Sequence, residues 1–102
     1  MEKKQDRLNS LYKWLRHNPI AAINALDLIK QHSLLTTGQI AEMLDLTRPT
    51  VTKMIASLAN KGWVEVQQNP NDKRIKTVAL TPDGDAELLM KKTELESIIG
   101  PV

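Results

Sequence analysis

The sequence has 102 residues, of which 41% are hydrophobic, 25% are charged and 3% are aromatic, and its formal net charge is +2. A chain of this size can bury one modest core, so we expect a single domain over residues 1–102. The absence of cysteine excludes disulfides and thiolate metal sites. No signal peptide and no run of about 18 apolar residues is visible, which favours a cytoplasmic protein without a membrane span.

The first third of the chain is predicted to form two helices. Apolar residues recur at helical spacing over residues 4–17, at Leu8, Leu11, Tyr12 and Leu15. Asn18 then suits the N-cap, and Pro19 the first helical position, of a second helix over residues 19–32. The following Leu34 and Leu35 are too short a run to predict more than an extended link.

Two further helices are predicted around a tight break at residues 45–47. Thr36 and Gln39 have the spacing of a capping box at the start of a short helix over residues 37–44. Thr47 is the expected cap of a longer helix over residues 48–60, which Gly62 ends as a left-handed residue. The inner side of the short helix is predicted to carry Ile40, Ala41, Met43 and Leu44. A short helix joined to a longer one by about three residues is the helix-turn-helix unit.

The periodicity changes after residue 62. Residues 63–68 and 75–80 have strand composition, and the turn cluster 69–72 between them predicts a β-hairpin. Thr81 and Pro82 repeat the cap-plus-proline signal and begin a last helix over residues 82–99. The predicted fold is therefore mostly α with a β-hairpin, in the order α-α-α-α-β-β-α. This is a winged helix-turn-helix, in which the hairpin is the wing.

The helix over residues 48–60 has two contrasting faces. Val51, Met54, Ile55 and Leu58 are predicted to pack inward, and Arg48, Thr50, Thr52, Lys53 and Ser57 to point outward. No acidic residue occurs from residue 46 to residue 64. Arginine can pair with guanine through two hydrogen bonds, and threonine offers a hydroxyl and a methyl group to base edges. The pattern indicates a helix for the major groove of DNA, and a solvated basic helix is the alternative.

Positive charge is concentrated in the middle of the chain. Residues 47–76 carry a net charge of +4, whereas residues 1–46 carry +1 and residues 77–102 carry −3. A polyanion would be the natural partner of such a segment. Charge alone leaves open the alternative of an ordinary solvated basic face.

Between Leu46 and Gly84 the sequence resembles the MarR family of winged-helix regulators. The matching segments are residues 47–52 (TRPTVT), residues 61–64 (KGWV) with Leu58 before them, residues 72–74 (DKR) and residues 80–84 (LTPDG). The resemblance implies a recognition helix in the major groove and a wing arginine directed toward the minor groove of double-stranded DNA. With the outward face described above, it predicts DNA binding by Thr47, Arg48, Pro49, Thr50, Thr52, Lys53, Ser57, Lys73 and Arg74.

The resemblance also implies a homodimer. Family members usually have longer helices at both ends, which build a dimer domain and often a pocket for small effectors. In this shorter sequence we expect dimerisation through the helices over residues 4–17 and 82–99, and no effector pocket of that kind. Leu88, Leu95 and Val102 are seven residues apart, which suits a stripe that packs either on a partner helix or on the protein's own core.

The sequence offers little for catalysis. His17 and His32 lack further ligands at metal-binding spacing and are predicted to lie on the surface, and there is no glycine-rich phosphate loop. We therefore predict a transcription regulator that is not an enzyme and uses no metal or cofactor. The alternative is a winged-helix protein-protein interaction module, or a DNA-binding accessory subunit of a partner protein.

Overall fold

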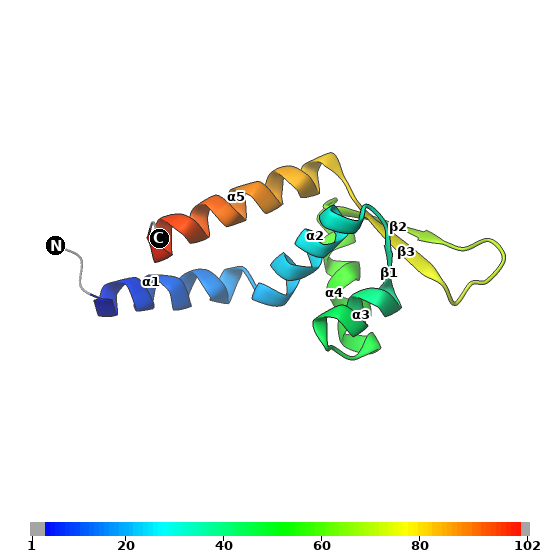
Figure 1. The fold of residues 1–102 in the computed structure, drawn as a ribbon, viewed down its shortest axis with the longest axis horizontal. Helices are drawn as coiled ribbons and strands as arrows, with labels where there is room; N and C mark the ends of the chain where they lie inside the picture. The colour runs from blue at the N-terminus through cyan, green and yellow to red at the C-terminus, as the bar shows by residue number, and fades with distance from the viewer. Residues whose placement is uncertain (1–3, 101–102) are drawn as a thin grey trace.

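The computed structural model describes residues 4–100, which form five helices and three short strands (Figure 1). The helices are α1 (Lys4–His17), α2 (Ile20–His32), α3 (Thr37–Leu44), α4 (Arg48–Asn60) and α5 (Pro82–Ile99). The strands are β1 (Leu35–Thr36), β2 (Val64–Gln68) and β3 (Lys76–Leu80). The predicted fold class, a mostly α winged helix-turn-helix, is confirmed.

Threonine side chains cap the first turns of three helices, as the sequence predicts. The amide of Gln39 donates to Thr36 Oγ1 at 3.0 Å, and the amide of Thr36 donates back to Gln39 Oε1 at 2.9 Å, which completes the capping box of α3. Thr47 and Thr81 cap α4 and α5 in the same way through their hydroxyl oxygens. These caps satisfy amides that have no partner within their own helix.

The prediction of a two-stranded hairpin and an extended link at Leu34–Leu35 is wrong in one respect. Leu35 and Thr36 form β1, which pairs antiparallel with Val78 and Thr77 of β3, so the sheet has three strands in the order β1-β3-β2. The element order is thus α-α-β-α-α-β-β-α. Two residues carry too little periodicity to predict a strand, and only the pairing with β3 makes them one.

The prediction for the start of the second helix is also wrong. Helix α2 begins at Ile20, and Pro19 occupies its cap position without a side-chain hydrogen bond. Asn18 faces the other way, because its Nδ2 donates to the carbonyl of Trp14 at 3.0 Å and so caps the end of α1. The side-chain amide of an asparagine between two helices can cap the end of the first or the start of the second. Here the surrounding tertiary contacts place it at the end of α1.

The core lies between α2, α3, α4 and the sheet. Its largest fully buried side chains are Leu26, Ile29, Ile40, Val51, Val78 and Leu88. The inward face of α4 is confirmed by the burial of Val51, Ile55 and Leu58, with Met54 half-buried. Met43, predicted on the inner side of α3, is instead 48% exposed, because helical spacing places it to one side of the face that Ile40, Ala41 and Leu44 share.

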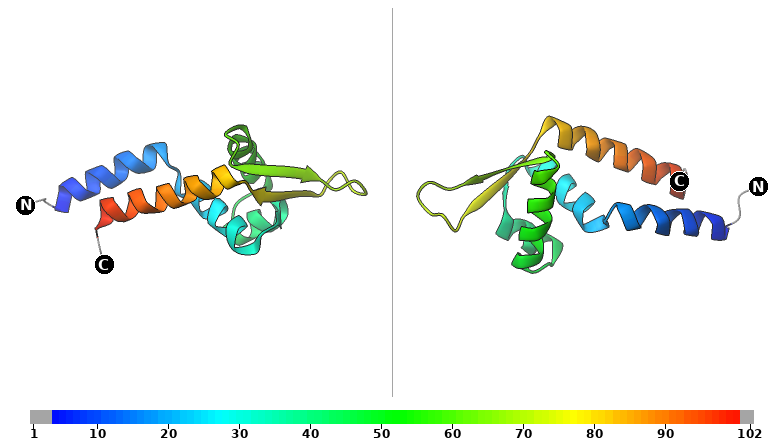
Figure 2. Two further views of the ribbon diagram at one scale, coloured as in Figure 1. Left: turned by 90° about the horizontal axis from the view of Figure 1, so that it is seen from above. Right: turned by 180° about the vertical axis from the view of Figure 1, so that it is seen from behind.

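Helices α1 and α5, here called the arm, extend away from the rest of the molecule, here called the head (Figures 1 and 2). The molecule is therefore elongated, at 59 × 26 × 23 Å. Leu88 of α5 is buried in the protein's own core, Leu95 is half-buried, and Leu89 and Ile99 remain exposed. Val102 lies outside the described residues. Within residues 4–100, no helix combines the length and the apolar character needed to cross a bilayer.

Candidate nucleic-acid interface

Helix α4 presents its polar residues to solvent. Thr47 Oγ1 accepts from the amide of Thr50 at 3.3 Å and lies 2.8 Å from Thr50 Oγ1, so the cap occupies both hydroxyls at the helix start. All seven residues predicted here to bind DNA are exposed, namely Thr47, Arg48, Pro49, Thr50, Thr52, Lys53 and Ser57. A helix buried on one side and polar on the other has the form required to enter the major groove.

The guanidinium of Arg48 lies across the start of α3. A Cβ at Gly38 would stand 2.7 Å from Arg48 Nη2 and 3.4 Å from its Cζ. The missing side chain of Gly38 therefore leaves room for the guanidinium between the first turns of α3 and α4. The positions of both α3 and α4 therefore determine the direction of the Arg48 guanidinium.

The outward residues of α4 occupy two flanks of the helix. Thr52 lines a groove toward the sheet, together with Val66 and Lys76. Lys53 and Ser57 line a second groove on the opposite flank, next to Pro19 at the start of α2. The structure thus separates residues that the sequence pattern treats as one face.

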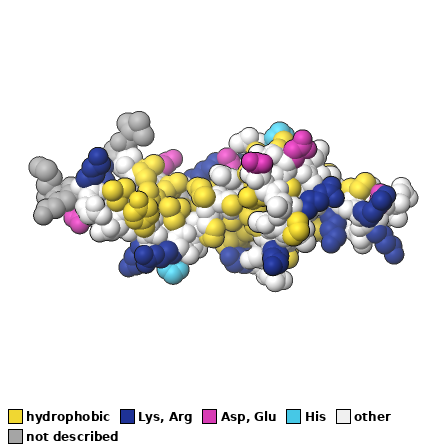
Figure 3. Space-filling model, turned by 90° about the horizontal axis from the view of Figure 1, so that it is seen from below, with side chains coloured by type: hydrophobic (Ala, Val, Ile, Leu, Met, Phe, Trp, Pro, Cys, Tyr) yellow, Lys and Arg dark blue, Asp and Glu magenta, His cyan; other side chains and the backbone are white. Residues whose placement is uncertain are grey.

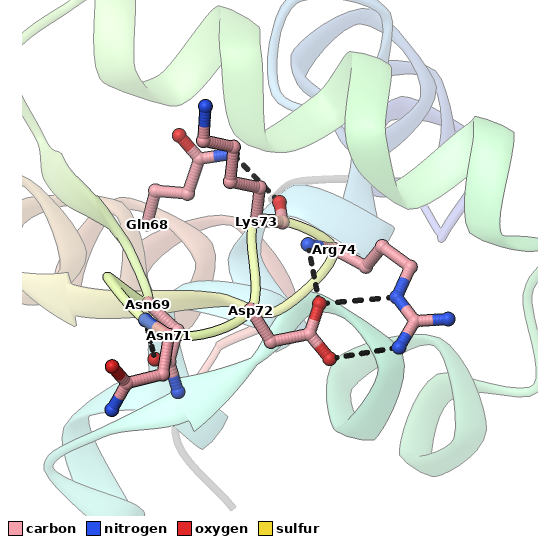
Figure 4. Close-up of polar contacts among 6 residues, drawn as sticks. All are labelled: Gln68, Asn69, Asn71, Asp72, Lys73 and Arg74. Carbon is pink, nitrogen blue, oxygen red and sulfur yellow. Dashed lines mark hydrogen bonds and ion pairs between the residues drawn. The ribbon is translucent and has the colours of Figure 1, made fainter.

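The wing is a structured loop rather than a loose tip. The amide of Asn69 donates to the carbonyl of Ile75 at 2.9 Å, and Gln68 Nε2 donates to the carbonyl of Lys73 at 2.7 Å. Asp72 organises the cations, because its Oδ1 accepts from both the amide and Nε of Arg74 at 3.0 Å, and its Oδ2 accepts from Nη2 at 3.0 Å (Figure 4). The exposed guanidinium is thereby held in one direction by a two-pronged ion pair.

The ion pair also shifts the pKa values of its two members. The side-chain hydrogen bonds from Arg74, followed by the bond from its amide, hold the pKa of the Asp72 carboxyl below its usual range. The carboxylate in turn raises the pKa of Arg74. Aspartate and arginine are both ionised at neutral pH, and the lowered pKa of Asp72 means that acid breaks the pair only at a lower pH than an isolated aspartate would require.

The surface carries basic side chains at the wing and an apolar patch over the arm. Figure 3 shows lysine and arginine side chains around the wing, and it shows the apolar patch of the arm bordered by further lysine and arginine side chains. No group of three or more His, Asp or Glu residues within residues 4–100 could hold a metal ion. His17 and His32 are both exposed, as predicted.

Three exposed residues of this region were not assigned from the sequence. Ala56 and Asn60 lie on the outward side of α4, and Lys76 begins β3 next to Thr52. Ala56 and Asn60 carry no charge and so gave no signal. Lys76 could have been found as the last cation of the basic segment, since it directly follows the wing.

The fold and this face define a winged helix-turn-helix protein. The sequence model of the MarR family matches residues 20–76, which is more than half of the chain. The chain belongs to the MarR family, as the resemblance implies.

Relatives of known function and solved structures agree with this assignment. The chain is 34% identical over 86 residues to the multiple antibiotic resistance protein MarR of Salmonella typhimurium, an alignment that covers 84% of this chain and 60% of that protein. It also resembles the YusO protein of Bacillus subtilis, with a TM-score of 0.77 and 25% identity over 94% of this chain and 67% of the other. A mutant of Escherichia coli MarR complexed with operator DNA matches with a TM-score of 0.66 and 30% identity, over 94% and 67% of the two chains.

Proposed function

We propose that the protein is a transcription regulator that binds double-stranded DNA sequence-specifically in the cytoplasm. In this proposal α4 enters the major groove and the wing, residues 69–75, reaches the adjacent minor groove. The observation that carries it is the exposed polar face of α4, which has no acidic residue, together with a wing arginine that Asp72 holds in one direction. Arginine suits a narrow minor groove because the negative potential is enhanced there.

Family membership supports the proposal. The family is one of transcription regulators rather than enzymes, and the related MarR mutant was solved with operator DNA bound. The chain spans about 60% of the length of the MarR proteins that it matches. The part that matches the family model, residues 20–76, contains both α4 and the wing. The DNA-binding set that we propose consists of Thr47, Arg48, Pro49, Thr50, Thr52, Lys53, Ser57, Lys73 and Arg74.

Replacement of Arg48 or Lys53 by alanine should weaken binding to a selected operator by about 1–2 kcal/mol, because each removes a contact to a base edge or a phosphate. Thermal unfolding should hardly change, since both side chains are exposed. Gly38→Ala is a subtler variant that displaces the Arg48 guanidinium without removing it, and it should produce a smaller loss. Fluorescence anisotropy on a duplex selected from a random pool measures all three. Unchanged affinity in both alanine variants would contradict the role given to α4.

We further propose that residues 1–102 form a single domain and that two copies of it form a homodimer through the arm. The arm exposes an apolar surface that a second copy would cover. The side chains that form it are 47–66% exposed and belong to Tyr12 of α1 and to Leu89, Met90 and Ile99 of α5. A two-fold dimer would place its recognition helices about 34 Å apart, one turn of DNA.

Light scattering should give a mass near twice the 11.5 kDa of one chain. Leu89→Lys should shift the protein toward monomer, because it puts a charge into the proposed interface. The matched control is Leu34→Lys, since Leu34 is 55% exposed but lies in the head. A parent protein that is monomeric both free and on DNA would contradict the dimer.

A protein-protein interaction module is the competing function for the same fold. Retention on random duplex DNA that falls steeply with salt supports DNA binding, because released counterions drive that association. Lack of retention at low salt would favour the interaction module instead.

A further inference from the structure

Lys91 is a buried lysine in the middle of α5. Only 9% of the residue is exposed, although lysine is among the residues least often buried. Its Nζ donates to Asn18 Oδ1 at 2.6 Å, lies 3.6 Å from Glu87 Oε1, and stands 5.0 Å from the centre of the Trp63 ring. The ammonium is therefore held by an amide, a carboxylate and an aromatic face.

These partners come from the places where the arm joins the head. Asn18 lies at the break between α1 and α2 and caps α1 through its bond to the Trp14 carbonyl. Trp63 lies between α4 and β2, where its amide donates to the carbonyl of Leu58 in the last turns of α4. One buried charge thus connects the end of α1, the middle of α5 and the end of the recognition helix.

Two other polar links between α5 and the head are of a different kind. Lys92 Nζ lies 2.6 Å from Asp27 Oδ1, and Lys30 Nζ lies 2.7 Å from Asp85 Oδ1. These four side chains are 33–52% exposed, so their ion pairs add little stability and hold their geometry loosely. The ammonium of Lys91 sits in a drier environment, where its attraction to its partners is stronger and depends on their positions.

Stability alone does not account for a charge at this position. Desolvation of an ammonium opposes folding, and an apolar side chain of similar volume often stabilises such a site as well or better. An apolar chain would also pack acceptably over a range of helix angles. A hydrogen bond to Asn18 and a cation over Trp63 are satisfied together in only a narrow range.

We propose that Lys91 is a positioning residue that fixes the angle between the arm and the head. In the dimer this angle sets the separation of the two recognition helices, and so the spacing of operator half-sites that the protein prefers. This second statement rests on the proposed homodimer and DNA binding, whereas the first concerns a single chain.

The angle can be measured without DNA. The sequence has no cysteine, so Glu42→Cys on α3 and Ser97→Cys on α5, both exposed, give one spin-label pair between head and arm. Labelled protein diluted with unlabelled protein reports distances within one chain by double electron-electron resonance. Lys91→Met should broaden or shift the narrow distribution of label distances found in the parent protein. Lys92→Met, the same change at the next residue, should leave that distribution unchanged.

Asn18→Ala provides a second route if Lys91→Met folds poorly. It removes the acceptor of the ammonium and leaves the lysine in place, so it should broaden the distribution in the same direction. Circular dichroism confirms that each labelled variant is folded. A distribution identical to that of the parent in whichever of these variants folds would overturn the proposal.

The spacing preference is tested on duplexes with two selected half-sites separated by varied numbers of base pairs. For the parent and for Lys92→Met, we expect the affinities for neighbouring spacings to differ by about tenfold or more. For Lys91→Met, we expect these affinities to differ by less than about threefold. Affinity for a single half-site should not change. A shifted label distance with an unchanged spacing preference would overturn the operator part. If the parent protein binds no duplex, the proposed function is refuted. The label distances still test the role of Lys91 in that case.

Discussion

Gly84→Ala is expected to destabilise the protein by more than about 4 kcal/mol, which would lower its melting temperature by roughly 15 °C or more. A Cβ at residue 84 would overlap the carbonyl oxygen of Trp63 and stand 2.8 Å from its carbonyl carbon. The obstacle is backbone, so no side-chain rotation relieves it. The Trp63 carbonyl is also fixed in place, because it accepts from the amide of Thr81 at 3.1 Å.

Gly62→Ala is the matched control for this prediction. Gly62 has a φ of +79°, but a Cβ there would meet nothing within 4 Å. The alanine should therefore cost only the conformational penalty of a left-handed residue, about 1–2 kcal/mol. Urea unfolding of both variants separates the two effects. Equal losses of stability would show that the contact between α5 and Trp63 is not the reason for a glycine at residue 84.

Arg74→Ala is expected to weaken operator binding by about 2–3 kcal/mol, or roughly 30- to 150-fold. Part of the loss is the missing cation, which Asp72 holds in a fixed direction and which therefore needs little further ordering on binding. The rest arises because the variant leaves the Asp72 carboxylate unpaired at a surface that would face phosphates. This combination makes the expected loss larger than for Arg48 or Lys53.

The two contributions can be separated in a double-mutant cycle. Asp72→Asn combined with Arg74→Ala should recover about 1 kcal/mol of the loss, because the repelling carboxylate is gone. Lys73→Ala is the companion variant, and it should weaken all sequences alike and reduce the salt slope by about one unit. Anisotropy titrations at several salt concentrations measure both. Full affinity in the Arg74→Ala variant would remove the wing from the DNA-binding surface.

Local sequence signals were sufficient for most of the helices. Thr36, Thr47 and Thr81 cap their helices through contacts within four residues, and the burial of Val51, Ile55 and Leu58 follows from helical spacing. The exposure of Arg48, Thr50, Thr52, Lys53 and Ser57 follows from the same spacing. The Asp72–Arg74 pair is local as well, because only one residue separates its members.

Tertiary contacts decided the features that depend on distant partners. Leu35 and Thr36 become a strand only through β3, more than 40 residues later, and Asn18 caps α1 rather than α2 while its other side-chain atom meets Lys91 of α5. Glycine at residue 84 matches a family motif in the sequence, but its reason is the Trp63 backbone. By itself the sequence determined which residues form helices, which face of α4 is buried and where the cations gather, because short-range periodicity and capping control these features. The third strand, the two flanks of α4 and the junction of arm and head were decided by packing between segments far apart in the chain, which no local pattern encodes.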